Sequence, residues 1–271
     1  MMKILDGREL ASYIKSRQSR EVTTLRVNHG KIPKLAIVQL KDDPIIDTYI
    51  RLKKKYGSEI GIEVDSYHPK RSETMATINQ LNKDHTVDGI IVQLPIENTE
   101  QTDDILNSVA VYKDVDALAK GSEFEPATPM AILWLLAGYN IELSGQNILV
   151  IGNGKLVGKP LSKMLRDSGQ KVTVADTKTK NLEQLALVSD IIITATGSPA
   201  ILKTNMIKPG TVIVDAGVAT DKGKRVGDLD ETIYRRDDLI ITPRRGGVGP
   251  LTICSLFANV IKSAQESVNK K

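Results

Sequence analysis

Three polar side chains in the first half of the chain have types and positions suited to chemistry. Tyr49 and Lys53 are four residues apart in a predicted helix, Ile46–Ile60, so a phenol and an amine share one helix face. Gln93 ends an apolar strand, Ile90-Ile91-Val92, with an amide. Each also has an ordinary structural explanation, because basic amphipathic helices are typical of solvated surfaces and buried amides are commonly satisfied by the backbone.

Two carboxylates follow at Asp114 and Asp116, within the segment Lys113-Asp114-Val115-Asp116. A turn or a helix cap explains either one alone, since aspartate is a preferred residue in both places. The pair precedes a polar segment, Lys120–Glu125, that we interpret as a hinge. The two carboxylates are therefore candidates only in combination with the side chains named above.

A glycine-rich turn occupies Asn147–Pro160 (NILVIGNGKLVGKP), where an apolar strand ends and a helix begins. Without a Cβ, Gly152 and Gly154 can adopt backbone angles closed to other residues, and Gly158 lets the helix approach its strand. Amides at the N-terminus of that helix would then face a pyrophosphate. The spacing is G-x-G-x-x-x-G, so a plain structural turn stays an alternative to a dinucleotide site.

The elements that hold this turn alternate between strands and helices. Thr196 and Gly197 follow the third strand, at the edge where ligands bind in such sheets. Asn181–Ser189 is predicted as a helix. Near-continuous apolar strands are typical of a parallel sheet covered on both faces, and they are predicted at Lys171–Ala175, Asp190–Ala195, Thr211–Asp215 and Leu239–Thr242. The pattern predicts a Rossmann-like, doubly wound dinucleotide-binding domain.

A separate α/β region with a mostly parallel sheet precedes residue 121. Its predicted elements are a helix after Asp6, strand Leu35–Leu40, helix Ile46–Ile60, strand Glu63–Tyr67, helix Thr74–Lys83 and strand Gly89–Leu94. The hinge leads into a connecting helix at Ala131–Leu136, and Leu251–Val268 is predicted as an amphipathic helix that returns to the first domain. We expect a two-domain α/β protein, with residues 1–120 and the C-terminal helix 251–271 in one domain and residues 121–250 in the other.

Composition narrows the class of protein. The 271 residues are 41% hydrophobic and 26% charged, as in ordinary globular proteins. A net charge of +4, without a basic run interleaved with aromatics, does not indicate a nucleic-acid partner. No signal peptide is evident, and no apolar run approaches the roughly 20 residues that span a bilayer.

Cysteine and histidine usage gives two further expectations. The single cysteine, Cys254, cannot form a disulfide within the chain and fits a reducing compartment, so we expect a cytoplasmic protein. The three histidines are scattered without ligand spacing, so no metal site is expected.

Taken together, the motifs resemble those of the bifunctional methylenetetrahydrofolate dehydrogenase/cyclohydrolase family, over nearly the whole chain and in the family's order. The segment Gly246-Gly247-Val248-Gly249-Pro250-Leu251-Thr252 is particularly specific. The other matching pieces are Asp43-Pro44, Tyr49-Ile50-x-x-Lys53, Asp88–Pro95 (DGIIVQLP), Lys113–Asp116 (KDVD), Thr128-Pro129, Val157-Gly158-x-Pro160, Gly227-Asp228 and Thr242-Pro243.

The resemblance implies two successive reactions in one cleft. A hydride passes from 5,10-methylenetetrahydrofolate to an oxidised nicotinamide, and water then opens the methenyl product to 10-formyltetrahydrofolate. By resemblance, Lys53 is the central group of the hydrolytic step and Gln93 contacts it and tunes its protonation. Tyr49 would stack on the aminobenzoyl part of the folate, and Asp116 would hydrogen-bond the pterin ring. A lysine flanked by two further lysines in a partly desolvated cleft should lose its proton more readily than a free one.

The resemblance also implies the site residues as sets. The catalytic set is Lys53, Tyr49, Gln93 and Asp116. The substrate-binding set is Tyr49, Gln93, Leu94, Pro95, Asp116, Gly247, Pro250 and Thr252. The cofactor-binding set is Thr128, Gly152, Asn153, Gly154, Val157, Gly158, Asp176, Thr177, Thr196, Gly197, Gly217, Arg244, Arg245 and Gly246.

Departures from the family's pattern concern the 2′-position of the dinucleotide. Asn153-Gly154 replaces the family's Arg-Ser phosphate clamp, and Asp176 lies 24 residues after Gly152, about where a Rossmann domain binds the ribose 2′-hydroxyl of NAD. Against NAD stand the family's usual preference for NADP and several cations, among them the Arg244-Arg245 pair, which would replace the missing clamp. The family's preference ranks NADP slightly ahead, and NAD stays possible.

Other departures and alternatives stay open at this point. Ala117 replaces a glycine after Asp116, and Ala127 replaces a cysteine before Thr128, and both changes bear on the shape of the cleft. Another NAD(P)-linked two-domain dehydrogenase, similar to shikimate or amino-acid dehydrogenases, would keep the glycine turn without needing Lys53. A non-catalytic cofactor-binding protein would do the same. For the assembly, the resemblance implies a homodimer.

Overall fold

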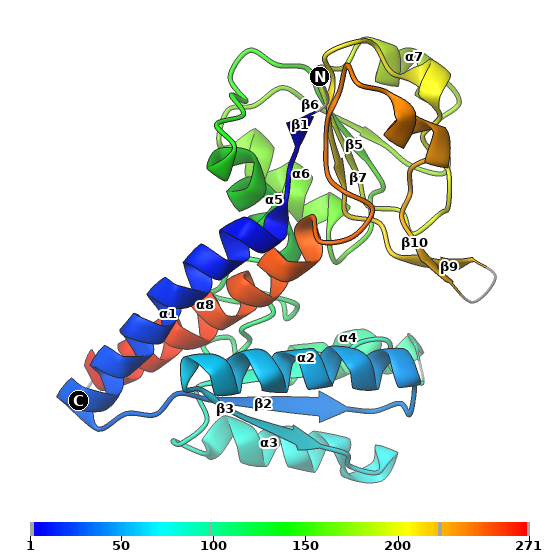
Figure 1. Cartoon of the computed structure of the whole chain (residues 1–271). Coiled ribbons are helices and arrows are strands. Elements are labelled where there is room, and N and C mark those ends of the chain that lie inside the picture. The colour runs from blue at the N-terminus through cyan, green and yellow to red at the C-terminus, as the bar shows by residue number, and fades with distance from the viewer. Residues whose placement is uncertain (1–2, 98, 222–223, 270–271) are drawn as a thin grey trace. The chain divides into compact units, whose positions relative to one another are not determined.

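The computed structural model describes residues 3–97, 99–221 and 224–269 (Figure 1). The chain divides into two compact units. We call residues 12–127 and 253–271 the three-stranded unit, and residues 1–11 and 128–252 the six-stranded unit. The boundaries fall inside α1 (Gly7–His29), at the start of α5 (Ala127–Gly138) and inside α8 (Val248–Asn269).

The three-stranded unit contains a wholly parallel sheet in the order β3-β2-β4. Its strands are β2 (Lys34–Gln39), β3 (Glu63–Tyr67) and β4 (Gly89–Gln93), and its helices include α2 (Pro44–Ile60), α3 (Thr74–Lys83) and α4 (Thr102–Asn107), with short 3₁₀ turns at Arg71–Glu73 and Thr99–Gln101. Figure 1 shows α2 and α3 on opposite sides of the sheet.

The central strand β2 is buried on both faces, and its side chains alternate between two cores. Leu35 and Ile37 belong to a cluster with residues of α2 and α8, whereas Ala36 and Val38 belong to a cluster with residues of α3 and α4. Because both faces of β2 are buried, successive residues of this strand have to be apolar, as the sequence predicts.

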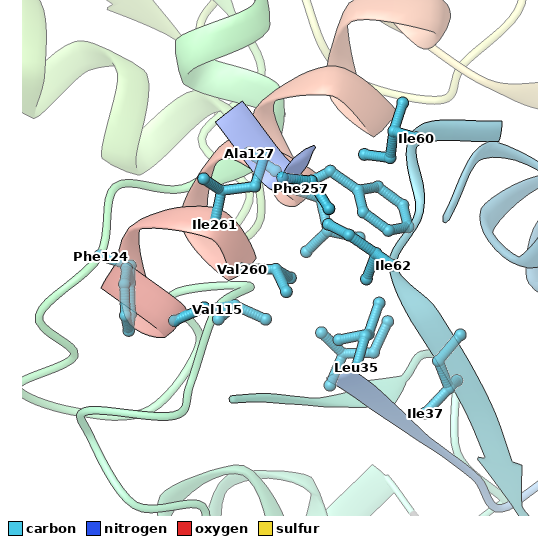
Figure 2. Close-up of a cluster of buried hydrophobic side chains, with 14 of the residues drawn as sticks. Leu35, Ile37, Ile60, Ile62, Val115, Phe124, Ala127, Phe257, Val260 and Ile261 are labelled. Carbon is cyan, nitrogen blue, oxygen red and sulfur yellow. The ribbon is translucent and has the colours of Figure 1, made fainter. Parts of the chain in front are cut away.

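Figure 2 shows the first of these clusters, to which α8 contributes Phe257, Val260 and Ile261 among others. Phe257, Val260 and Ile261 lie against residues of the sheet and of the α2–β3 connection, and all three are at most 2% exposed. Burying each such side chain contributes about 1.5–3 kcal/mol relative to leaving it in water. The last helix of the chain is thus part of the core of the unit that carries α2.

Local sequence explains where α2 begins and ends. The carboxylate of Asp43 accepts a hydrogen bond of 2.8 Å from the backbone N–H of Ile45, and Pro44 occupies the first turn, where its missing N–H has no partner to lose. Gly61 ends the helix with a φ of 84°, a left-handed conformation that suits glycine. These caps fix the helix on which Tyr49 and Lys53 lie.

The six-stranded unit has one parallel sheet in the order β1-β11-β8-β7-β5-β6. Its strands are β1 (Lys3–Ile4), β5 (Ile148–Ile151), β6 (Val172–Ala175), β7 (Ile191–Thr194), β8 (Val212–Asp215) and β11 (Ile240–Ile241). From β5 the chain goes to β6 on one side and then to β7 on the other, so the strand order reverses at β5. In doubly wound sheets, ligands bind outside the carboxyl ends of the strands at this switch point.

The remaining elements of the six-stranded unit connect these strands. They are α6 (Gly158–Asp167), α7 (Leu182–Leu187), the antiparallel pair β9 (Ala219–Asp221) and β10 (Lys224–Val226), and 3₁₀ turns at Thr204–Met206 and Glu231–Arg235. The unit has its own hydrophobic core, to which β5, β7, β8 and β11 all contribute buried side chains.

The two-domain α/β fold class predicted from the sequence is confirmed. The boundaries of the two units differ from the expected ones mainly at the N-terminus, because β1 pairs with β11 and so residues 1–11 belong to the six-stranded unit. A strand of two residues has too short an apolar pattern to be predicted, and β9 and β10 were not predicted either. Among the residues that the structure describes, no helix is long and apolar enough to cross a membrane.

We predict that Gly57→Ala destabilises the protein, although alanine normally favours a helix over glycine. A Cβ at Gly57 would lie 2.5 Å from Cγ2 of Val64 and 3.0 Å from the carbonyl oxygen of Ile62, so the sheet would have to shift away from α2. Overpacking of this kind costs about 1–3 kcal/mol. Urea unfolding should show the loss, whereas Ser58→Ala on the exposed face of the same helix should not; equal stability of Gly57→Ala and wild type would contradict the packing argument.

Candidate active site

In the three-stranded unit, the structure brings together three of the four side chains expected to be catalytic. Lys53 on α2 donates a hydrogen bond of 2.7 Å from its Nζ to Oε1 of Gln93, at the end of β4. Gln93 also donates from its Nε2 to the carbonyl oxygen of Leu94, at 3.0 Å. The amide is thus satisfied by the backbone on one side and turned to the lysine on the other.

The electrostatics of Lys53 and Asp116 are coupled. Burial lowers the pKa of the Lys53 amine below its usual range, and the negative charge of Asp116 partly opposes the shift. Burial raises the pKa of the Asp116 carboxyl, and the positive charge of Lys53 partly opposes that shift. Both groups are therefore moved toward their uncharged forms, as expected where desolvation outweighs the attraction between them. An amine with a lowered pKa is suited to accept a proton at a lower pH than an ordinary lysine.

The other expected folate-side residues lie close in sequence to this trio. Tyr49 is half-buried and lies one helical turn before Lys53 on α2. Leu94 is half-buried and Pro95 is exposed, and the peptide bond between them is cis. Strand β4 therefore ends in a polar side chain followed by a bend, at the same sheet edge as Gln39, its partner in register on β2.

Lys113 and Asp114 have structural roles next to Asp116. Lys113 is buried, and its Nζ donates to the carbonyl oxygens of Leu81 at 2.9 Å and Asp84 at 2.6 Å, at the C-terminus of α3. A cation at that end of a helix is favourable. Asp114 is also buried, accepts from the backbone N–H of Ala119 at 2.8 Å, and has a pKa that burial raises to about 6. These two residues hold the segment that presents Asp116.

Ala117 adopts a left-handed conformation, with a φ of 57°. This conformation costs a residue with a Cβ about 1–2 kcal/mol, and glycine adopts it freely. The alanine that stands after Asp116, in place of a glycine, therefore strains the backbone.

In the six-stranded unit, the glycine turn has the close contacts of a phosphate cradle. Gly152 has a φ of 109°, and a Cβ there would lie 2.5 Å from the carbonyl oxygen of Ala195. A Cβ on Gly158 would overlap the carbonyl oxygen of Gly152. The N-terminus of α6 can approach β5 only because both residues lack side chains, so the turn is built for a close backbone approach and fits a dinucleotide.

The rest of the turn faces outward. Residues 153–156 are exposed, Val157 directly precedes α6, and a Cβ on Gly154 would meet nothing within 4 Å. Gly154 is thus not required by packing in the way that Gly152 and Gly158 are.

Loop 195–199, after β7, is anchored by a buried carboxylate. Asp228, which is 0% exposed, accepts from the backbone N–H of Thr196 at 2.7 Å and from that of Ser198 at 3.1 Å. Its own N–H donates to the carboxylate of Asp215, at 3.0 Å. Gly217 completes the arrangement, since it donates its N–H to Asp215 and a Cβ on Gly217 would overlap the Asp228 carboxylate.

This carboxylate pair is the part of the site that sequence reasoning missed. Burial raises the pKa of Asp215 to about 6, and the charge of Asp228 adds to the shift. The sequence contains the motif Gly227-Asp228 but does not indicate its role, because the partners of Asp228 follow other strands. The signal in the sequence is the glycine before Asp228: a Cβ on Gly227 would overlap the Asp215 carboxylate.

Asp176 and Thr177 are exposed and directly follow β6. Asp176 heads a tight turn, in which its Oδ1 accepts from the backbone N–H of Lys178 at 2.9 Å. Its backbone N–H donates to Oγ1 of Thr179, at 3.0 Å. The position after the second strand of the sheet is the one predicted from the sequence.

The Arg244-Arg245 pair lies at the other side of the sheet. It follows β11, which is four strands from β6, or about 19 Å at the usual strand spacing. Arg244 is paired with Glu231, with Nη2 to Oε2 at 2.6 Å, and its guanidinium lies 4.3 Å from the centre of the Tyr234 ring. The carbonyl oxygen of Arg245 accepts from Arg8 at 3.1 Å. The structure therefore does not bring this pair to the end of β6, where Asp176 stands.

The glycine segment after β11 packs against the start of α1. The backbone N–H of Gly7 donates to the carbonyl oxygen of Gly246 at 2.9 Å, and a Cβ on Gly247 would lie 2.9 Å from Cβ of Thr242. Thr252, four residues into α8, lies with its Oγ1 3.5 Å from that of Thr128 on α5. Pro250 is half-buried in the first turn of α8.

Comparison with known proteins identifies the family. Residues 5–116 match the model of the tetrahydrofolate dehydrogenase/cyclohydrolase catalytic domain, and residues 126–268 match that of the NAD(P)-binding domain of the same proteins. The bifunctional protein FolD of Campylobacter concisus is 37% identical over 99% of this chain and 100% of its own length.

Solved structures agree with this. The bifunctional FolD enzyme of Campylobacter jejuni superposes with a TM-score of 0.92 at 36% identity, covering 98% of this chain and 99% of that one. The FolD of Trypanosoma brucei, solved with NADP and an inhibitor, has a TM-score of 0.91 at 27% identity and 98% coverage of both chains.

The chain belongs to the tetrahydrofolate dehydrogenase/cyclohydrolase family. Its activities are those of a methylenetetrahydrofolate dehydrogenase and a methenyltetrahydrofolate cyclohydrolase, and it contains the family's catalytic domain and its NAD(P)-binding domain. The match covers both domains, so the alternatives of a different two-domain dehydrogenase or a non-catalytic binding protein are not favoured.

We predict that Ala117→Gly stabilises the protein by about 0.5–1 kcal/mol, because relief of the left-handed strain exceeds the entropy that glycine adds to the unfolded chain. Urea unfolding measures the difference. Ala76→Gly, at an exposed position in α3, is the matched control and should be destabilising by up to about 1 kcal/mol. A loss of stability in Ala117→Gly as large as in the control would show that the φ at this position carries no strain.

We predict that Asp228→Asn costs about 2–3 kcal/mol, because an amide offers one acceptor oxygen where two backbone N–H groups need partners, and it loses a charge. Asp230→Asn is the control, since the Asp230 carboxylate caps only an exposed 3₁₀ turn, through Thr232. Thermal unfolding of both variants tests this, and a Tm for Asp228→Asn no lower than that of the control would remove Asp228 from its anchoring role.

Proposed function

We propose that the three-stranded unit binds the folate and holds the hydrolytic group, Lys53, and that the six-stranded unit binds the nicotinamide dinucleotide at Gly152. The observation that carries the first assignment is the hydrogen bond of 2.7 Å between Lys53 and Gln93, with Asp116 coupled electrostatically to the same amine. The steric demand for glycine at residues 152 and 158 supports the second. The matches to the two family models fall on the corresponding parts of the chain.

For the oxidation, the chain mainly has to position its substrate. A bound NAD(P)+ accepts the hydride of the methylene carbon, and the ring nitrogens beside that carbon stabilise the cation that forms. Tyr49 then serves to orient the aminobenzoyl group, and the two oxygens of Asp116 pair with two donors on the aminopyrimidine edge of the pterin. Orientation of this kind can contribute several kcal/mol to the rate, because it removes the entropy of bringing the reactants together.

For the hydrolysis, Lys53 acts in its neutral form. The amine accepts a proton from the water that adds to the methenyl carbon, and it returns a proton to N5 as the bond between that carbon and N5 breaks. The hydroxyl proton leaves to solvent, and the formyl group remains on N10. Gln93 holds the amine in place through Oε1, and the low pKa of Lys53 makes the neutral form available at lower pH than for an ordinary lysine.

The assembly and location follow the family resemblance. We propose a homodimer, which sedimentation velocity distinguishes from a monomer of 29.7 kDa. The single buried cysteine is compatible with the cytoplasm, which we retain as the proposed location.

We predict that Lys53→Met loses at least about a hundredfold in cyclohydrolase rate, the usual scale for a proton-transferring group, and keeps dehydrogenase activity within several-fold. Absorbance of the methenyl folate and of the reduced nicotinamide follows the two steps separately. Lys54→Met is the control, since Lys54 is exposed and its amine binds Ser66, and it should leave both rates unchanged. Intact hydrolysis in Lys53→Met would remove Lys53 from its role.

The pH dependence of the cyclohydrolase rate tests which protonation state of Lys53 is active. Because the neutral amine is active, the cyclohydrolase rate should fall as the pH drops through the lowered pKa of Lys53, with a midpoint below the ordinary lysine value of 10.5. A rate that instead rises toward acid would show that the ammonium form is the active one.

A further inference from the structure

We propose that the six-stranded unit prefers NAD+ to NADP+, and that the carboxylate of Asp176 is the residue that discriminates between them. The inference rests on the proposed dinucleotide site at Gly152 and deepens it. It also reverses the order suggested by the family's preference, for reasons that lie in this chain's own contacts.

Asp176 stands beside the glycine turn because of strand register. Ala175 on β6 pairs with Ile151 on β5, so the residues that follow, Asp176 and Gly152, leave the sheet side by side. The backbone N–H of Gly152 donates to the carbonyl oxygen of Ala175, at 2.8 Å, and ties the two strand ends together. A dinucleotide whose pyrophosphate lies on the glycine turn therefore places its adenosine ribose at the end of β6.

The turn after β6 fixes the carboxylate there. Oδ1 of Asp176 accepts from the N–H of Lys178, which holds the side chain over its own turn. Its Oδ2 has no hydrogen-bond or ion-pair partner among the residues that the structure describes. A carboxylate only accepts hydrogen bonds, so it can bind the 2′-hydroxyl of NAD+ but not the 2′-phosphate of NADP+, which is anionic and also an acceptor.

The discrimination arises from charge rather than from size. Asp176, Thr177 and residues 153–156 are all exposed, so packing does not close the end of β6 to a phosphate. The first side chain of the turn, Asn153, is neutral. Selectivity based on repulsion between exposed charges falls as salt screens them, so the preference should weaken with ionic strength.

The available cations do not offset this carboxylate. Lys178 and Lys180 are exposed, and ordering either long side chain on a phosphate costs side-chain entropy, whereas the carboxylate of Asp176 is already held by the N–H of Lys178. Arg244 is paired with Glu231 and stacked on Tyr234, and three strands, β8, β7 and β5, separate β11 from β6. An arginine pair at that end of the sheet cannot clamp a phosphate beside Asp176.

The test is equilibrium binding of NADH and NADPH to the full chain, followed by nicotinamide fluorescence at low and high salt. Wild type should bind NADH at least tenfold more tightly than NADPH at low salt, and less selectively at high salt. Asp176→Asn keeps the shape and the acceptor of the turn but removes the charge, so it should reduce the ratio at least fivefold, mainly through tighter NADPH binding. Asp237→Asn, an exposed aspartate near the amino end of β11, should leave the ratio unchanged.

The outcomes separate the inference from the function on which it rests. Binding of neither nucleotide would overturn the dinucleotide site itself. Equal or tighter binding of NADPH by wild type would overturn the preference and leave the site standing. A preference for NADH that survives Asp176→Asn unchanged would overturn the assignment to Asp176.

Discussion

The Lys53–Gln93 pair of the three-stranded unit and the glycine turn of the six-stranded unit depend on the same constraint, the parallel pairing of every strand in the two main sheets. In a parallel sheet the carboxyl ends of all strands lie at the same edge. The one or two residues that follow each strand therefore lie along that edge. In the six-stranded unit, the residues along this edge include Gly152, Asp176, Thr196 and Gly217. In the three-stranded unit, Gln93 at the end of β4 lies within hydrogen-bond distance of Lys53. The pairing of short apolar strands thus brings together polar groups that are distant in sequence.

Much of this arrangement could be predicted from the sequence because its signals are local. The strand Glu63–Tyr67 and the helix Thr74–Lys83 were predicted with the bounds that the structure has, since apolar periodicity and end signals coincide there. The position of Asp176 followed from its spacing after Gly152. The contact between Lys53 and Gln93 was expected only by resemblance, and the structure shows it, while the roles of both residues stay predictions.

What the sequence left hidden depends on contacts between distant segments. The anchoring of loop 195–199 by Asp228 could not be derived, because aspartate after glycine is an ordinary turn pair until its neighbours are known. Likewise, the sequence motifs predict both Arg244 and Asp176 to bind the dinucleotide. Only the strand order shows that the two residues follow strands that are far apart in the sheet. The edge strand β1 escaped notice because two residues carry no periodicity.

The place of α8 in the core has a consequence for synthesis. Phe257, Val260 and Ile261 are translated about 200 residues after Leu35 and Ile62, yet they share one cluster of buried side chains with them (Figure 2). The sheet β3-β2-β4 must therefore wait with an uncovered apolar face while some 160 residues are added after β4. Over the same interval residues 128–252 are translated, which is all of the six-stranded unit except its first 11 residues, so the three-stranded unit is the one that completes its core last.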